Sequence, residues 1–202
     1  MIRTYDFSNF DAVKQDFMYA ISPLCRGAHP EFAEESDAVV NRALPEEGQF
    51  EYISMVTREK LPMGTKLTVH CSFDHFGAPL IVFSDDIGTD ENGTNLYGLH
   101  FEVVAFEEGC NVWHIEPAGP DAPRPIKTEK IGILRFPVAE GSRVEITTAL
   151  GQGEITVSVN GQSLTLARED FPASAHMGFT ACEGINRFYD LTIETPEGEE
   201  RG

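Results

Sequence analysis

The stretch that decides the fold reads Ile155-Thr156-Val157-Ser158-Val159-Asn160-Gly161-Gln162-Ser163-Leu164-Thr165-Leu166. Apolar and polar side chains alternate on both sides of Asn160-Gly161, and this alternation is typical of strands with one buried face. Asn-Gly is the preferred pair for a two-residue type I′ turn, in which both residues have positive φ. The stretch therefore predicts a β-hairpin.

Similar short patterns extend outward from this hairpin in both directions. Residues 67–73 alternate strictly, whereas residues 80–83 are continuously apolar, as expected of a strand buried on both faces. Residues 84–95 are polar and predict a loop. The expected strands lie near residues 50–57, 67–73, 80–83, 96–106, 111–116, 130–136, 143–149, 155–159, 163–166, 177–182 and 187–193. Short strands separated by frequent turns predict an all-β antiparallel sandwich or barrel.

One helix is expected ahead of the strands, over residues 9–21, because its apolar residues repeat at three- and four-residue steps. Asn9 can cap this helix, and Pro23 disfavours helix in the residue before it. Residues 23–48 predict a loop with a short strand near Val39-Val40.

Length and composition fit one domain over residues 1–202. The chain is 41% hydrophobic, which is enough for one core, and no linker-like segment divides it. The acidic residues 195–202 are expected to fray. Four cysteines (Cys25, Cys71, Cys110 and Cys182) have no metal-ligand spacing and predict free thiols, and we expect neither a cofactor nor a metal.

Charge restricts the partners. The net charge is −18, from 33 acidic and 15 basic residues, so nucleic acid and membrane surfaces are not expected to bind. The N-terminus lacks the pattern of a signal peptide, and no apolar run approaches the roughly 20 residues that cross a bilayer. These features predict a cytoplasmic location.

Two pairs of stretches carry a resemblance to a known superfamily. Residues 157–161 (VSVNG) and 178–190 (GFTACEGINRFYD) are similar to the closing strands of concanavalin A-like lectin and glucanase domains, and residues 76–82 and 100–113 agree with it. The resemblance covers about residues 50–194 and implies a two-sheet jelly-roll sandwich. This architecture hosts lectins, glycosidases and adhesion modules, so it implies a fold more narrowly than a function.

Within this resemblance, residues 102–107 (EVVAFE) look like the E-x-D-x-x-E strand of laminarinase-type β-glucanases, which would make Glu102 a nucleophile and Glu107 a general acid/base. A retaining glycosidase needs its carboxyl groups about 5–5.5 Å apart. Positions five apart on a regular strand face opposite sides, so only a β-bulge would bring both to one face. Val104 also stands where the family has Asp, and we therefore expect no hydrolysis.

Carbohydrate binding without catalysis, on the concave sheet of a lectin-like domain, is the first hypothesis, because it needs only an aromatic face and a few polar groups. Trp113 is the only tryptophan, and it alternatively packs in the core. His100, Glu102 and His114 could supply polar groups, and Arg187 could reach the same cleft or pair with a carboxylate.

Two alternatives stay open: a glycoside hydrolase that uses Glu102 and Glu107, and a structural or protein-interaction domain. Residues 85–92 are rich in oxygen ligands but do not match a calcium loop, so we expect a solvated loop there.

Overall fold

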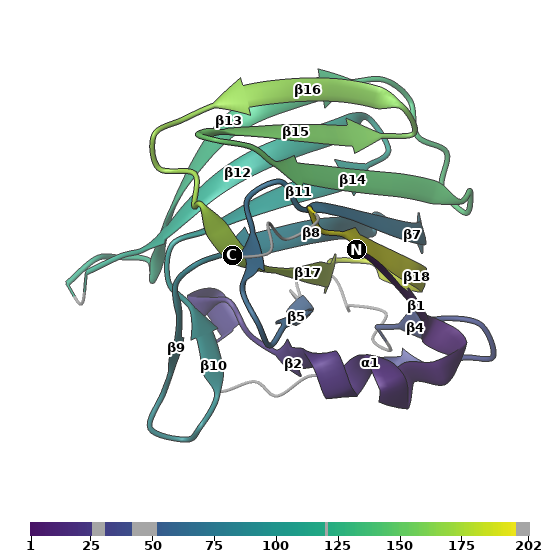
Figure 1. The fold of residues 1–202 in the computed structure, drawn as a ribbon, viewed down its shortest axis with the longest axis horizontal. Helices are drawn as coiled ribbons and strands as arrows, with labels where there is room; N and C mark the ends of the chain where they lie inside the picture. The colour runs from purple at the N-terminus through teal and green to yellow at the C-terminus, as the bar shows by residue number, and fades with distance from the viewer. Residues whose placement is uncertain (26–30, 42–51, 120, 197–202) are drawn as a thin grey trace, which may run out of the picture.

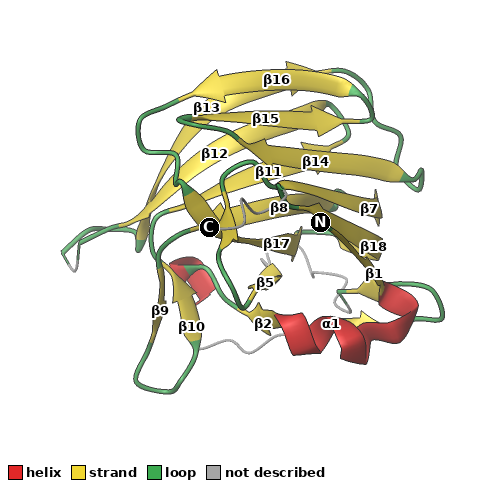
Figure 2. Cartoon of the chain, viewed as in Figure 1, coloured by secondary structure: helices red, strands yellow, loops and turns green. Residues whose placement is uncertain are grey.

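The computed structural model describes residues 1–25, 31–41, 52–119 and 121–196, and its strands form two large antiparallel sheets, one behind the other (Figures 1 and 2). Sheet 1 contains, in spatial order, β16 (Gln162–Ala167), β15 (Glu154–Val159), β14 (Val144–Leu150), β7 (Lys66–Asp74), β18 (Ile185–Glu194), β4 (Val39–Val40) and β3 (Ala33–Glu34), and β1 (Ile2–Asp6) also pairs with β18. Sheet 2 contains β13 (Ile126–Arg135), β12 (Gly109–Pro117), β11 (His100–Phe106), β8 (Ala78–Ser84), β17 (Ser174–Cys182), β5 (Tyr52–Thr57) and β2 (Phe17–Tyr19), and β6 (Leu61–Pro62) pairs with β17.

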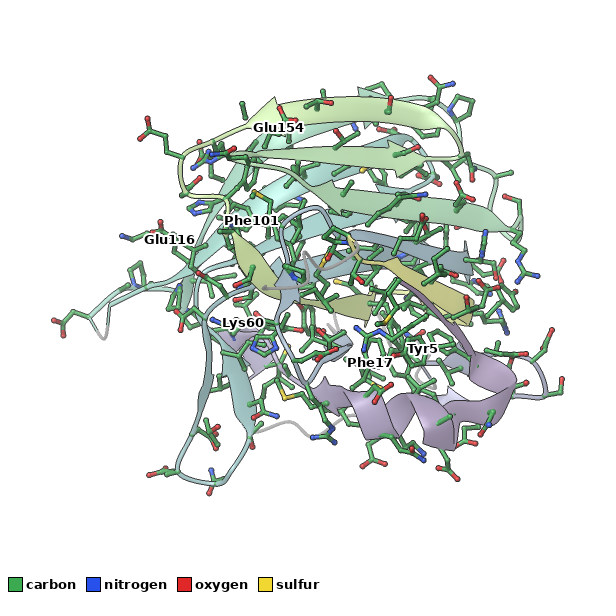
Figure 3. All side chains as sticks on the ribbon, in the orientation of Figure 1. Tyr5, Phe17, Lys60, Phe101, Glu116 and Glu154 are labelled. Atoms are coloured by element: carbon green, nitrogen blue, oxygen red, sulfur yellow. The ribbon has the colours of Figure 1, made fainter. Side chains whose placement is uncertain are left out.

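The core lies between the inward faces of the two sheets. Alternate residues of β7 and β11 reach it, among them Val69 and Phe101, both of which are fully buried. Figure 3 shows Phe101 within the body of the sandwich and Tyr5 beside Phe17, whose rings pack edge to face at 5.1 Å. The predicted all-β sandwich is therefore confirmed, and so are its predicted strands with one correction. The strand expected over residues 96–106 is interrupted at residues 98–99, and only its second part, β11, belongs to sheet 2. Residues 50–51, at the start of another strand, lie outside the described residues.

The N-terminal helix is shorter than predicted. After a 3-10 turn, η1 (Phe7–Asn9), helix α1 spans only Phe10–Asp16, and Asn9 makes no side-chain cap hydrogen bond. The predicted end near residue 21 is wrong because residues 17–19 form β2, which pairs with β5 at the edge of sheet 2. A tertiary pairing has overridden a helical pattern of apolar residues.

The polar segment over residues 84–95 is also more ordered than predicted. It contains β9 (Ile87–Thr89), which pairs with β10 (Asn95–Tyr97) in a small hairpin that projects from the sandwich (Figure 1). Three-residue strands are too short for alternation to distinguish them from a loop. A second 3-10 turn, η2 (Pro23–Cys25), lies in the expected loop, where β4 confirms the short strand near Val39.

The type I′ turn at Asn160-Gly161 is confirmed, with φ values of 49° and 79°. We expect Gly161→Val to lower the free energy of unfolding by about 1–2 kcal/mol, because a β-branched residue is strained at positive φ. Urea denaturation measures the loss. Gly119→Val is the matched control, since both glycines have open space around the added side chain but only Gly161 has positive φ. Equal stability of the two variants would contradict the strain.

All four cysteines are free, and burial raises the pKa of each thiol, to about 11 for Cys25 and about 12 for Cys110. None of the helices in the described ranges is both long enough and apolar enough to span a bilayer.

Candidate functional site

Three of the expected site residues share the outer face of sheet 2. The inward neighbours Phe101 and Val103 lie in the core, so His100 and Glu102 point to the opposite side. Trp113 is directly opposite Glu102 in the pairing of β11 with β12 and lies on the same face. The shared face of His100 and Glu102 agrees with the alternation of β11, whereas their use as a binding site stays a prediction.

Glu102 is nevertheless buried. Its residue is only 8% exposed, and Tyr52 donates a hydrogen bond of 2.8 Å from its hydroxyl to Glu102 Oε1. Burial, followed by the nearby Glu102 carboxylate, raises the pKa of Tyr52 well above its usual value of 10, so the phenol stays protonated as a donor. His100 is fully buried, and its Nε2 lies 3.6 Å from the same oxygen, too far for a hydrogen bond.

The segment before η2, together with β10, forms a cover that contributes to the burial of Glu102 and His100. Ile21 donates its N–H to the carbonyl of Asn95 and accepts a bond from the N–H of Tyr97, which ties the segment before η2 to β10. Tyr97, the last residue of β10, is itself buried, and its ring stacks on that of His100 with the ring centres 4.8 Å apart. The outer face of sheet 2 around Glu102 (hereafter the covered face) is therefore not an open cleft.

Neither Trp113 nor His114 completes an open site on the covered face. Trp113 is half-buried, and the ammonium of Lys130 lies 4.7 Å from the centre of its ring. His114 follows Trp113 and faces the other way, with its ring 5.2 Å from that of Phe101. Its Nε2 lies 3.5 Å from an Asp170 carboxylate oxygen.

Arg187 lies in the other sheet. It is on β18, where its guanidinium donates to Glu35 at 3.1 Å and to Asp74 at 3.2 Å. The structure thus brings His100, Glu102 and Trp113 together but separates His114 and Arg187 from them.

Glu107 is also separated from Glu102. The pairing of β11 with β12 is regular from His100 to Phe106, so the bulge that would turn Glu107 onto the face of Glu102 is absent from this strand. Glu107 lies in the exposed turn after β11. The two carboxylates therefore occupy different environments: Glu102 lies within the covered face, and Glu107 lies at the open end of the sandwich.

Glu107 lines a different feature, a cavity of about 290 Å³ at that end of the sandwich. We call it the end cavity. It lies where the connections β7–β8, β13–β14 and β17–β18 pass from one sheet to the other, beside the last residues of β11. Its walls consist of Phe73, Phe76, Gly77, Ala78, Val104, Phe106, Glu107, Asn111, Glu140 and Glu183.

Two turns pack backbone to backbone and fix one wall of the end cavity. A Cβ atom on Gly184, in the β17–β18 turn, would lie 2.2 Å from the backbone nitrogen of Gly77, in the β7–β8 turn. Phe76 has φ 63°, and its N–H donates to Glu140 Oε1 at 3.0 Å. These contacts hold Phe76 outward, where it is 77% exposed.

The chemistry of the end cavity combines aromatic rings with hydrogen-bond acceptors. Phe76 and Phe106 offer apolar faces, while Glu107, Glu140 and Glu183 offer carboxylates. Such a combination suits a ligand with an apolar face and donor groups around its edge. The volume is near the lower end of the roughly 300–1,000 Å³ that small-molecule sites occupy.

Sequence reasoning missed Phe76, Glu140 and Glu183. One signal was present: Phe76 is an aromatic residue in the six-residue connection, residues 74–79, between two predicted strands, where burial is not expected. The carboxylates carried no such signal, because they come from separate connections that only the fold brings together.

The described residues contain no group of three or more His, Cys, Asp or Glu side chains arranged to hold a metal. In the oxygen-rich segment that begins at residue 85, Asp90 Oδ1 accepts the N–H groups of Asn92 and Thr94.

Solved structures of other proteins share this arrangement of strands. Carbohydrate-binding module CBM66 from Bacillus subtilis superposes with a TM-score of 0.59 at 9% identity, over 83% of this chain and 92% of the module. A legume lectin-like domain from Entamoeba histolytica gives 0.54 at 10% identity, over 93% of both chains. The chain has a concanavalin A-like jelly-roll fold.

This concanavalin A-like fold also includes enzymes. The GlcNAcα1-4Gal-releasing endo-β-galactosidase of Clostridium perfringens superposes with a TM-score of 0.59 at 5% identity, over 95% of this chain and 61% of the enzyme. No family model matches the sequence, and no curated protein is significantly similar to it in sequence. At these identities the similarity establishes the fold alone.

Proposed function

We propose that this chain is a non-catalytic, lectin-like domain that binds carbohydrate in the end cavity. Phe76 carries the proposal, because it is the most exposed of the large apolar side chains in the described residues, at 77%. Hydrogen bonding by its own backbone and close packing of its turn hold it in place. An aromatic ring fixed at the rim of a cavity can stack on the apolar face of a pyranose.

The polar groups of the end cavity complement such a sugar. Carboxylates of Glu107 and Glu183 accept hydrogen bonds from hydroxyl groups, and these are the groups that orient a sugar once its ring is stacked. Structural neighbours whose names denote carbohydrate binding or lectin-like domains support this class of ligand. The covered face is less suitable, because His100 is fully buried and Glu102 is 8% exposed.

The non-catalytic part of the proposal is supported by the separation of the two expected catalytic carboxylates. Glu102 accepts a hydrogen bond from Tyr52 under a cover, and Glu107 lies in a turn at the end of the strand. A glycosidase needs both carboxyl groups to flank the same glycosidic bond.

Phe76→Gly tests the proposal. Glycine removes the ring and accepts positive φ, so we expect stability to change by less than about 1 kcal/mol while binding falls at least about tenfold. Binding is measured by calorimetry with neutral gluco-oligosaccharides and N-acetylglucosamine oligomers of equal length.

His75→Gly is the matched control for this variant. His75 precedes Phe76 and has φ 53°, but its side chain does not line the end cavity. Equal binding by the Phe76 variant and the parent would place the ligand elsewhere. Hydrolysis of any of these sugars that is lost in Glu107→Gln would support the enzyme instead, and failure of every glycan to bind would support a protein-interaction domain.

A further inference from the structure

The ionisable side chains of the end cavity are all acidic. Glu107, Glu140 and Glu183 line it, and no lysine, arginine or histidine does so among the described residues. Glu107 and Glu183 have no ion-pair partner in the described part of the chain. Arg135 contacts two lining residues, but it is engaged with them: it donates to Asn111 Oδ1 at 3.3 Å and lies 5.4 Å from the centre of the Phe106 ring.

A buried acceptor behind the wall is also unused. Asn186 is fully buried, and its Oδ1 has no hydrogen-bond partner. A Cβ atom placed on Gly77 would lie 2.9 Å from this oxygen, so the oxygen lies directly against a residue that lines the end cavity. The amide nitrogen of the same side chain is satisfied, because it donates to the Glu183 carbonyl at 2.7 Å. The charged groups that line the end cavity are therefore all acceptors, and the free Asn186 oxygen lies behind this lining, against Gly77.

We propose that the end cavity selects sugars with free, protonated amino groups, such as glucosamine units, over N-acetylated, neutral and anionic sugars. This inference rests on the proposed carbohydrate-binding function. An ammonium group donates three hydrogen bonds and accepts none, which matches the surplus of acceptors. It also interacts favourably with the faces of aromatic rings such as Phe76 and Phe106.

Acetylation of the amine would remove the charge and leave two carboxylates without a cation. A uronic acid would add a further carboxylate beside Glu107, Glu140 and Glu183, where like charges repel. The net charge of −18 extends this preference beyond the cavity, because it attracts cationic oligosaccharides and repels anionic ones at a distance.

The experiment compares four hexasaccharides by calorimetry at low salt and slightly acidic pH: fully deacetylated chitohexaose, N-acetylated chitohexaose, cellohexaose and hexagalacturonate. We expect the deacetylated chitohexaose to bind at least about tenfold more tightly than the acetylated form, and hexagalacturonate not to bind. The preference should weaken as salt is added, because the carboxylates are exposed to solvent.

A pair of double variants separates the end cavity from the general negative field. Glu107→Gln combined with Glu183→Gln should reduce the preference for the deacetylated sugar at least about fivefold. Glu91→Gln combined with Glu169→Gln changes the net charge equally, at exposed positions outside the cavity, and should leave the preference unchanged. Phe76→Gly should weaken binding of the deacetylated sugar more than it weakens association of spermine, because spermine has ammonium groups but no sugar ring to stack on Phe76.

Four results would overturn the inference. Three of them are equal binding of the acetylated and deacetylated sugars, equal losses in the two double variants, and full displacement of the sugar by equimolar spermine. Binding that disappears with EDTA would likewise assign the carboxylates to a metal ion. If neutral sugars bind and Phe76→Gly abolishes that binding, the proposed function stands and only the amine preference fails. If none of the four sugars binds, the proposed function itself fails.

Discussion

Replacing Gly178 by alanine is expected to lower the free energy of unfolding by at least about 3 kcal/mol. Gly178 lies in β17, between β8 and β5 in the middle of sheet 2. A Cβ atom there would lie 1.8 Å from the carbonyl oxygen of Met55 and 2.7 Å from the Cα of Val56. These are backbone atoms of a paired strand, so no side-chain rotation can relieve the clash, and β5 would have to separate from β17.

Chemical denaturation with urea, followed by circular dichroism, measures this loss. Gly88→Ala is the control, because Gly88 has no atom within 4 Å of its added Cβ and its φ is not positive. The control should stay within about 0.5 kcal/mol of the parent. A Gly178→Ala protein as stable as Gly88→Ala would show that β17 and β5 do not approach so closely.

Phe179→Ala is expected to cost about 3–5 kcal/mol, since it removes a fully buried ring and leaves a cavity. Its ring centre lies 4.8 Å from that of Phe7, 5.2 Å from Phe32, 5.0 Å from Phe188 and 6.2 Å from Phe17. These rings come from the N-terminal segment and from both sheets. The substitution should therefore loosen the attachment of the N-terminal segment as well as the core.

Phe179→Leu keeps most of the buried volume and should cost clearly less than the alanine variant. Ile133→Ala, at a residue that is 48% exposed, should cost little. Amide hydrogen exchange provides a second readout, in which Phe179→Ala should increase exchange in α1 more than in β15. Similar losses in the alanine and leucine variants would argue against a cavity as the cause.

Strand positions could be predicted from the sequence because alternation is a local property. The hairpin over residues 155–166 could be predicted from those residues alone, and β7 likewise alternates through its length. The end of α1 could not be predicted in this way. Residues 17–19 carry helical spacing, but their partners in β5 are far along the chain, and that pairing determines their structure.

Some features of the candidate site could be predicted from the sequence, and others could not. Period-two geometry alone implies that Trp113 and His114, as neighbours on one strand, face opposite ways, so the separation of His114 was accessible from sequence. Assigning Arg187 to the other sheet required the topology. The end cavity required it too, since Phe76 and Glu140 are 64 residues apart and meet through one hydrogen bond.

The position of β18 affects how this protein folds as it is synthesised. β18 is the last strand of the described chain, yet it pairs with β7 on one side and with β4 and β1 on the other. β1 pairs with β18 in sheet 1, so it lacks this partner until residues 185–194 have been synthesised. Sheet 1 can close only after translation of residues 185–194, and pairings between segments so far apart in sequence are intrinsically slow to form.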